Sequence, residues 1–283
     1  MVGGKLYPLR AAALILCGRS WCSFQEAMAG RKNREAQLRL KAELAKSLRM
    51  VKEDGEFVLW ETNGEQYWLP RASRILPGML AEQRLGVYNL AGEGPRQNDL
   101  VFDCGASIGL YTLQALVRGA SKVIAIEPSP RNFECLRRNL GVPVREGRVV
   151  LVAKGVWDAE QCRTIRMQPA NSAADSLALN YRGSIAGPQV PLTTIDLLVR
   201  ELELDRVDYI KMDIEGAEGA ALKGAAATIR RFRPRMVIAM EHRFADPREI
   251  PKIISEIASE YRIRRGPCVD TGHALRPATL YFH

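Results

Sequence analysis

The stretch that decides the fold class is Val101-Phe102-Asp103-Cys104-Gly105-Ala106-Ser107-Ile108-Gly109. Apolar residues lead into a carboxylate, which is followed by a glycine, three small or apolar residues and a second glycine. A helical pattern covers residues 110–118, and a second apolar run at 122–126 ends at Glu127. The order of strand, glycine turn, helix, strand and carboxylate is typical of the first half of a nucleotide-binding α/β domain.

The glycine turn favours one kind of nucleotide over another. A dinucleotide site usually reads G-x-G-x-x-G and places a pyrophosphate at the helix N-terminus. Here the spacing is D-x-G-x-x-x-G, and Asp103 would repel a pyrophosphate but suits the ammonium and sulfonium of S-adenosylmethionine. We therefore expect this cofactor, with the Glu127 carboxylate accepting hydrogen bonds from both ribose hydroxyls.

Composition and charge indicate a soluble globular protein of 283 residues, with 47% hydrophobic and 26% charged residues. The net charge of +9 is concentrated at the N-terminus. Residues 1–50 contain ten Lys or Arg and three Asp or Glu, whereas the remaining 233 residues contain 31 and 29. A nucleic-acid enzyme would carry basic residues around its active face, so this distribution argues against nucleic acid as a partner.

The six cysteines are scattered, without a C-x-x-C pair or a histidine cluster at zinc-finger spacing. We expect reduced thiols in a cytoplasmic protein, and neither a disulfide framework nor a zinc site.

Residues 1–52 form a predicted basic helical leader. Its apolar run at 11–17 is too short to span a membrane, and Arg19, Gln25 and Glu26 argue against a signal peptide. Residues 24–51 have helical spacing of apolar side chains. Two interpretations stay open: this helix packs on the domain or on a second subunit, or it lies peripherally on an anionic membrane.

Residues 53–95 are predicted to form a β-hairpin and helical extension, because Asn63-Gly64 is a strong hairpin signal. From residue 96 to 283, strands at 149–153, 207–212 and 235–240 alternate with helices at 132–140, 194–202, 219–231 and 250–261, and short β-like runs follow at 262–264 and 280–282. Residues 167–190 lack periodicity and are either a substrate lid or a mobile surface loop. The pattern predicts a mostly parallel sheet with helices on both faces.

Five blocks of this chain resemble the FkbM-type S-adenosylmethionine-dependent methyltransferases. They are residues 101–112, Ile126-Glu-Pro-Ser-Pro130 with Asn139, Thr193-Thr-Ile-Asp196, Asp208-Tyr-Ile-Lys-Met-Asp-Ile-Glu-Gly-Ala-Glu218 and Ala239-Met-Glu-His242. The blocks span about residues 96–245, and the fourth and fifth look specific to the family. Ser107 stands where the family often has asparagine, and the leader lies outside the resemblance.

The resemblance implies a Rossmann-like, seven-stranded class I methyltransferase sheet and methylation of small-molecule hydroxyls, in sugars or polyketide-like natural products. It implies catalytic roles for His242, Asp213 and Glu215. It also implies a cofactor site made of Asp103, Gly105, Ala106, Ser107, Gly109, Glu127, Pro128 and Ser129.

Strand ends support this assignment independently, because ligands of open α/β sheets bind beyond the carboxyl ends of the strands. His242 is the expected general base, since its ordinary pKa lies near neutrality. Asp213, Glu241 and His242 are candidate ligands for a divalent metal, although we favour a metal-free site. Arg71, Arg74 and Arg84 either contact an anionic acceptor or are solvated surface charges. A nicotinamide-dependent oxidoreductase and a non-catalytic cofactor-binding scaffold remain the alternatives.

Overall fold

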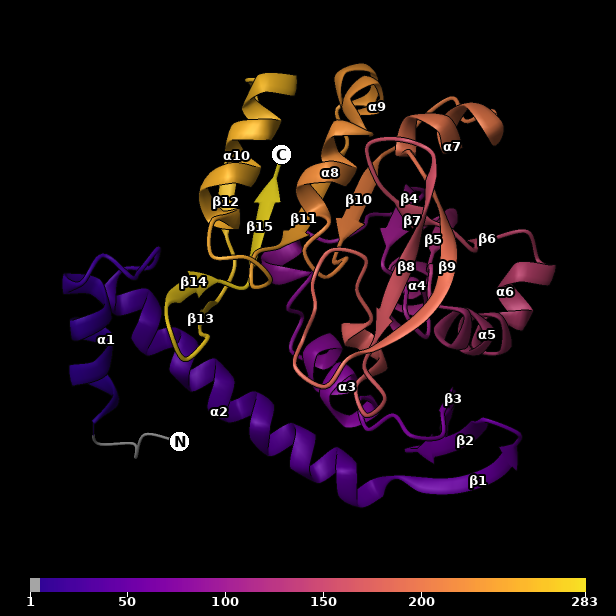
Figure 1. Ribbon diagram of the computed structural model, residues 1–283, viewed down its shortest axis with the longest axis horizontal. Coiled ribbons are helices and arrows are strands. Elements are labelled where there is room, and N and C mark those ends of the chain that lie inside the picture. The colour runs from indigo at the N-terminus through magenta and orange to yellow at the C-terminus, as the bar shows by residue number, and fades with distance from the viewer. Residues whose placement is uncertain (1–5) are drawn as a thin grey trace.

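The computed structural model describes residues 6–283 (Figure 1). The first five residues of the predicted basic leader lie outside this range.

A seven-stranded sheet forms the centre of the molecule, in the order β12-β15-β11-β10-β4-β5-β6. The strands are β4 (Leu100–Cys104), β5 (Lys122–Ile126), β6 (Val149–Val152), β10 (Tyr209–Met212), β11 (Arg235–Ala239), β12 (Ile263–Arg265) and β15 (Thr279–Phe282). Neighbours from β6 to β11 run parallel, whereas β15 is antiparallel to both β11 and β12. The order and the reversed last strand confirm the predicted class I methyltransferase sheet.

Helices cover both faces of the sheet (Figure 1). They are α4 (Leu110–Val117), α5 (Pro130–Asn139), α6 (Gly141–Arg145), α7 (Ile195–Glu201), α8 (Glu218–Lys223), α9 (Ala226–Phe232) and α10 (Asp246–Ile257). Along β4 the buried side chains alternate between two apolar clusters, with Phe102 in the cluster beneath α7–α10 and Val101 in the cluster beneath α4 and α5. Because both faces of β4 are buried, its residues are apolar except for Asp103.

One helix that the sequence predicts, at 219–231, is two helices that meet at Gly224. A Cβ at this glycine would lie 2.0 Å from the carbonyl oxygen of Trp157. The close approach explains the glycine and the interruption between α8 and α9.

A second sheet corrects the prediction of an irregular segment at 167–190. It contains β7 (Gly155–Val156), β8 (Gln161–Met167) and β9 (Ile185–Thr193), with β9 in the middle. Most side chains of β8 and β9 are exposed, so the sequence shows little alternation of apolar and polar residues. The irregular part is therefore 168–184, which contains one 3₁₀ turn, η2 (Ser172–Ala174).

The N-terminal part contains α1 (Tyr7–Leu16), α2 (Phe24–Ser47), β1 (Arg49–Asp54), β2 (Phe57–Thr62), β3 (Glu65–Pro70), α3 (Leu76–Arg84) and the 3₁₀ turn η1 (Leu90–Gly92). The predicted hairpin is confirmed as β2–β3, with positive φ at Asn63 and Gly64. The helix predicted to reach residue 51 ends at Ser47, because Arg49 begins a strand that pairs with β2. The domain boundaries at residues 52 and 95 stay predictions.

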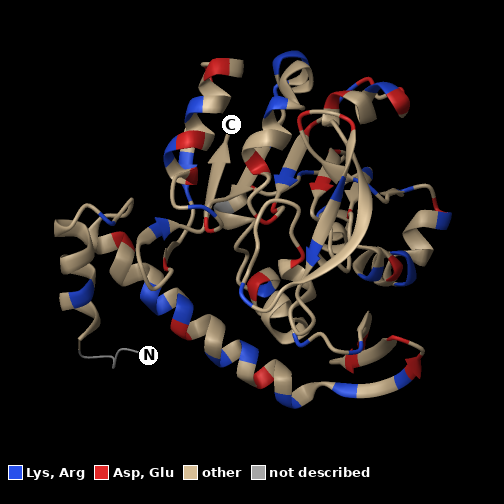
Figure 2. Ribbon diagram, viewed as in Figure 1, with Lys and Arg blue, Asp and Glu red and all other residues tan. Residues whose placement is uncertain are grey.

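Helix α2 crosses the lower side of the molecule in Figure 1, with Lys and Arg spaced along it in Figure 2. A capping box of Ser23 and Glu26 begins it. Leu44 joins a buried apolar cluster with residues of β3 and α3. Contact of residues 1–52 with a membrane or a second subunit stays a prediction. Within residues 6–283, no helix is both long enough and apolar enough to cross a bilayer.

A disulfide corrects the prediction of reduced thiols. It joins Cys22, just before α2, to Cys268 in β13 (Cys268–Asp270), which pairs with β14 (Leu275–Pro277). The two cysteines are 246 residues apart in sequence but only 6.3 Å apart at Cα. Only the fold brings them together, which is why spacing could not predict the pair. Since disulfides are typical of oxidising compartments, the expected cytoplasmic location loses the support that reduced thiols gave it.

Candidate functional site

A cavity of about 480 Å³ opens at the carboxyl ends of β4, β5, β10 and β11. Three walls surround it: the glycine turn after β4 with Glu127, the residues after β10 and β11, and a wall from α2 and α3. The segment 168–184 lies along its rim through Ala170, Asn171, Ala173, Asp175 and Leu177. The predicted cofactor, catalytic and metal residues that line the cavity come from the sheet side: Gly105, Ala106, Ser107, Glu127, Pro128, Asp213, Glu215, Glu241 and His242.

The glycine turn brings the backbone directly against the cavity. Gly105 has φ +81°, and a Cβ there would lie 1.9 Å from the carbonyl oxygen of Asp213. Ser107 also has positive φ, at 50°. The turn therefore packs closely against the end of β10, which only a glycine at 105 allows, and Gly105, Ala106 and Ser107 all line the cavity.

Glu127 follows β5 and is buried beside the turn. Its Oε2 accepts a hydrogen bond from the amide of Ser107 at 2.8 Å, and its Oε1 accepts one from the amide of Ser129 at 2.9 Å. Each oxygen keeps a second lone pair for a ligand hydroxyl. Burial raises the pKa of Glu127 to about 7, although both amide bonds oppose the increase.

Asp103 and Gly109 do not line the cavity. The Asp103 carboxylate is fully buried, accepts a hydrogen bond from Thr112 Oγ1 at 2.7 Å and pairs with Lys211 Nζ at 3.2 Å. Lys211 stands opposite Asp103 in the β4–β10 register. Gly109 begins α4, and a Cβ there would lie 3.0 Å from Leu136. Both residues stabilise the turn from the side of the core and not from the side of the cavity.

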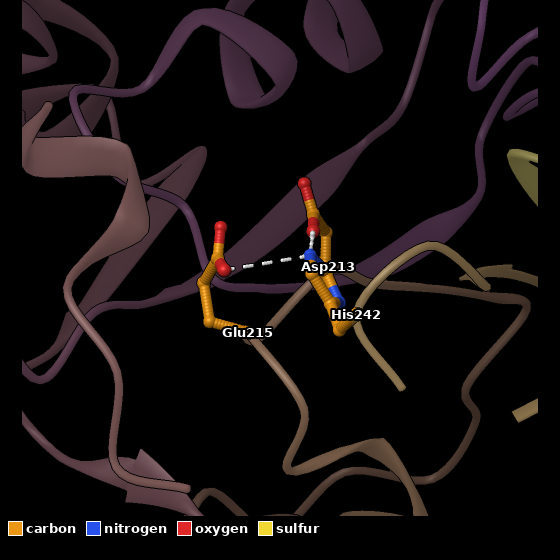
Figure 3. A group of neighbouring side chains, drawn as sticks. All are labelled: Asp213, Glu215 and His242. Atoms are coloured by element: carbon orange, nitrogen blue, oxygen red, sulfur yellow. Dashed lines mark ion pairs between the residues drawn. The ribbon is translucent and has the colours of Figure 1, made fainter. Parts of the chain in front are cut away.

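Asp213, Glu215 and His242 form one group that lines the same cavity as Glu127, and Figure 3 shows the three side chains close together. Asp213 and Glu215 follow β10, and His242 follows β11. His242 Nε2 lies 3.4 Å from Asp213 Oδ1 and 3.6 Å from Glu215 Oε2. Two hydroxyls complete the group, because Tyr88 donates to Asp213 at 2.7 Å and Tyr181 of the 168–184 segment donates to Glu215 at 2.6 Å.

Glu218, at the start of α8, fixes the orientation of His242. One of its oxygens, Oε1, lies 3.0 Å from His242 Nδ1 and also accepts the amide of Ile214 at 3.0 Å. With the Nδ1 proton directed at Glu218, Nε2 faces the cavity end. Sequence reasoning quoted Glu218 as the last residue of its family-specific block but gave it no role.

The charges of this group determine its protonation. Burial alone would lower the pKa of His242, but Glu218 and then Glu215 and Asp213 raise it well above its ordinary value. Burial raises the pKa of Glu215 to about 7. Burial also acts to raise the pKa of Asp213, but Lys211 and His242 hold it below its usual range. The free protein therefore holds an imidazolium among carboxylates at neutral pH.

The predicted metal ligands are only partly brought together. Ligand atoms of Asp213, Glu215 and His242 lie within 4.8 Å of one another, so these three residues could hold a cation. Glu241 lines the cavity but does not belong to this group. The structure thus places Glu215 where the sequence predicted Glu241.

Of the three arginines that the sequence offered as contacts of an anionic acceptor, Arg74 lines the cavity, whereas Arg71 and Arg84 do not. Sequence reasoning missed the rest of the wall from α2 and α3. It contributes Lys41, Gly78, Glu82 and Tyr88 to the cavity, with Arg74 just before α3. Burial raises the pKa of Glu82 to about 7, and Gln37 of α2 donates to its Oε1 at 3.0 Å. These residues lie outside the quoted motifs, and only the packing of α2 on α3 brings them to the site.

Sheet order, reversed last strand and glycine turn together define a class I methyltransferase fold. The family profile described as the methyltransferase FkbM domain matches residues 103–262, more than half of the chain. The chain belongs to the FkbM methyltransferase family.

Three solved structures give measures of similarity. Methyltransferase FkbM from Methylobacillus flagellatus is 27% identical, with 66% of this chain and 44% of that chain covered and a TM-score of 0.48. A putative transferase from Pyrococcus horikoshii is 17% identical, with 89% and 82% covered and a TM-score of 0.45. M. jannaschii TYW2, in complex with AdoMet, is 16% identical, with 83% and 86% covered and a TM-score of 0.43.

This chain therefore spans less than half the length of the M. flagellatus protein. No curated protein matches it significantly.

Proposed function

We propose that this protein transfers a methyl group from S-adenosylmethionine to a hydroxyl oxygen of a small molecule, a sugar or polyketide-like natural product. One observation carries the proposal. One cavity is lined both by the glycine turn with Glu127 and by the group of Asp213, Glu215 and His242. A nucleoside and a hydroxyl acceptor therefore fit side by side.

The cofactor supplies a methyl group that is already activated by its sulfonium. The chain holds the donor through the backbone at Gly105 and Ser107 and through the free lone pairs of Glu127. Such positioning of two reactants supplies about 7–11 kcal/mol in well-oriented systems. Asp103 supports the turn through Lys211 and makes no contact with the cavity.

His242 Nε2 is the proposed acceptor of the hydroxyl proton. A base at this point adds roughly 10²–10⁴-fold to the rate. Because the carboxylates keep His242 protonated in the free protein, activity requires its pKa to fall or the pH to rise. A cationic ligand beside the ring lowers its pKa, and alkaline pH removes the proton directly. Activity is therefore expected to increase as the pH rises above neutrality.

A metal-free site is proposed, because every member of the group already has a partner. Tyr88 donates a hydrogen bond to Asp213, Tyr181 donates one to Glu215, and Glu218 is hydrogen-bonded to His242. We expect methylation to survive exhaustive chelation and to be unaffected by added Mg²⁺ or Mn²⁺. Loss of activity on chelation, restored by either ion, would assign Asp213, Glu215 and His242 as metal ligands.

Calorimetric titration with S-adenosylhomocysteine tests the cofactor assignment. The wild type should bind with micromolar affinity, and Glu127→Ala should abolish or greatly weaken binding. Glu146→Ala is the matched control, because Glu146 is exposed and does not line the cavity. A well-folded wild type that fails to bind would remove the methyltransferase proposal. Screening of sugars and polyketides with the methyl donor follows, with His242→Ala expected to reduce turnover by roughly 10²–10⁴-fold.

A further inference from the structure

The α2–α3 wall of the cavity carries two cationic side chains that have no partner in the described part of the protein. Lys41 belongs to α2, and Arg74 lies two residues before α3; both line the cavity. Within residues 6–283, neither side chain forms an ion pair or a side-chain hydrogen bond. Both residues are solvent exposed, so their donors are free for a ligand.

Local structure holds both cations at the cavity. Lys41 Nζ lies 3.7 Å from the position that a Cβ would take on Gly78, which itself lines the cavity. The absence of a side chain at Gly78 leaves the ammonium facing that space. The backbone amide of Arg74 donates to the carbonyl of Ala170 at 3.0 Å, which places Arg74 where the wall meets the 168–184 segment.

The other cations of the cavity are already occupied. Lys211 is buried, pairs with Asp103 and donates to the carbonyl of Gly105 at 2.9 Å. His242 is surrounded by carboxylates. The carboxylate of Asp175, near Arg74 on the rim, is bound by Arg131 and Ser129. Among the described residues, Lys41 and Arg74 are therefore the cations of the cavity that have no anionic partner within ion-pair distance.

We propose that Lys41 and Arg74 form an anion-binding subsite that takes a carboxylate or phosphate group of the ligand lying against α3. The fork of an arginine and the point charge of a lysine suit an oxyanion. Two sources can supply this group: the carboxylate of the cofactor's amino-acid part, or an anionic acceptor. The proposal rests on the proposed function, because the cavity is the one assigned to cofactor and acceptor.

Titration calorimetry on the full chain tests the subsite with Lys41→Met, Arg74→Met and the control Lys46→Met. Lys46 is exposed on the same helix and does not line the cavity. The probes are S-adenosylhomocysteine and S-adenosyl-3-thiopropylamine, which lacks only the carboxylate. Inorganic phosphate is then titrated into each protein, with and without S-adenosylhomocysteine. Thermal unfolding verifies that each variant is folded.

The outcomes separate the two sources. If the cofactor supplies the anion, both variants lose at least about tenfold in affinity for S-adenosylhomocysteine and none for the decarboxylated probe. If the acceptor supplies it, both variants bind S-adenosylhomocysteine normally but lose the phosphate binding that the loaded wild type shows. Variants that match Lys46→Met in every titration would overturn the subsite.

The same titrations distinguish failure of the proposed function from failure of the subsite. A wild type that does not bind S-adenosylhomocysteine refutes the methyltransferase proposal, while phosphate binding by the unliganded protein still decides the subsite. Phosphate bound by the wild type and lost in both variants supports it, and equal binding by all proteins rejects it.

Discussion

Glu127 links cofactor affinity to pH. Its pKa of about 7 means that half of the carboxylate is protonated at neutral pH in the free protein. Ribose hydroxyls donate more strongly to the ionised form, so S-adenosylhomocysteine should bind about tenfold more tightly at pH 8 than at pH 6. Calorimetry across this range measures the change. In Glu127→Gln the affinity should be weaker and nearly constant; an equally steep profile would assign the titration to another group.

The same raised pKa affects stability in the opposite direction. Between the unfolded value of about 4.5 and the folded value of about 7, the folded protein binds more protons at Glu127 than the unfolded protein. This group alone therefore makes the free energy of unfolding fall as the pH rises through that window. A bound cofactor would offset the loss, because it stabilises the ionised form.

His242 should titrate well above an ordinary histidine. The chain contains three histidines, so ¹⁵N-labelled imidazoles can be resolved by NMR during a pH titration. We expect His242 to remain protonated at neutral pH and Glu218→Gln to lower its pKa, since Glu218 is the strongest of the charges that raise it. Its contribution to stability is complete below the unfolded pKa and is lost as the pH rises through the folded pKa. An ordinary pKa in the wild type would contradict this account.

The placement of residues at the cavity was predictable where a strand end alone decides it. Glu127, Asp213 and His242 each follow a strand, and parallel strands bring their carboxyl ends to one edge. Asp103 also ends a strand, but its side chain turns into the core because Lys211 stands opposite it in the sheet. Which residues face each other across strands depends on the strand order, and one sequence does not show that order.

The 168–184 segment is the element that closes the rim of the cavity. Asp175 holds it by accepting hydrogen bonds from Ser129 Oγ at 2.7 Å and from the amide of Gln168 at 2.8 Å, and by pairing with Arg131. Asp175→Ala should release the segment, because three sets of bonds disappear at once. We expect faster proteolytic cleavage within 168–184 and faster amide exchange there.

A matched control for this prediction is Asp158→Ala, which removes an exposed carboxylate that does not line the cavity. If S-adenosylhomocysteine fails to slow cleavage of the wild type, the segment does not cover the cofactor. Equal cleavage of Asp175→Ala and wild type would show that Asp175 does not hold the segment.

Strands with buried faces could be predicted from the sequence, whereas the largely exposed strands could not. The apolar runs of β4, β5, β10 and β11 are unambiguous because both faces of these strands are covered. Strands β8 and β9 are largely exposed, and Gly187, Pro188 and Pro191 obscure β9 further. These two strands form because they pair with each other. The spacing of apolar residues within one segment does not show which other segment it pairs with.

At the scale of the whole molecule, the Cys22–Cys268 disulfide ties the N-terminal helices to the C-terminal hairpin. A native disulfide across a long loop stabilises by about 2–4 kcal/mol. Replacing both cysteines by serine should therefore lower the melting temperature, on the order of 10 °C. Differential scanning calorimetry under non-oxidising and oxidising conditions measures the change.

Cys17→Ser is the appropriate control, since Cys17 is exposed and unpaired. It should melt like the wild type. If reducing agent leaves the wild-type melting temperature unchanged, the covalent bond does not stabilise the protein, and the non-covalent contacts hold this region together, among them the ion pair of Arg10 with Asp270 and the buried apolar cluster around Leu275.

Helix α2 has a consequence for how the protein can be divided. It is joined at its beginning to the C-terminal hairpin through Cys22 and Cys268, and it packs along its second half on α3, where Lys41 lines the cavity. A fragment limited to residues 103–262, the portion matched by the family profile, would lack β12, β15 and the first half of β4, and would also lack the α2–α3 side of the cavity. The cavity is thus not contained in the family domain, and removing α2 and α3 would remove one of its sides.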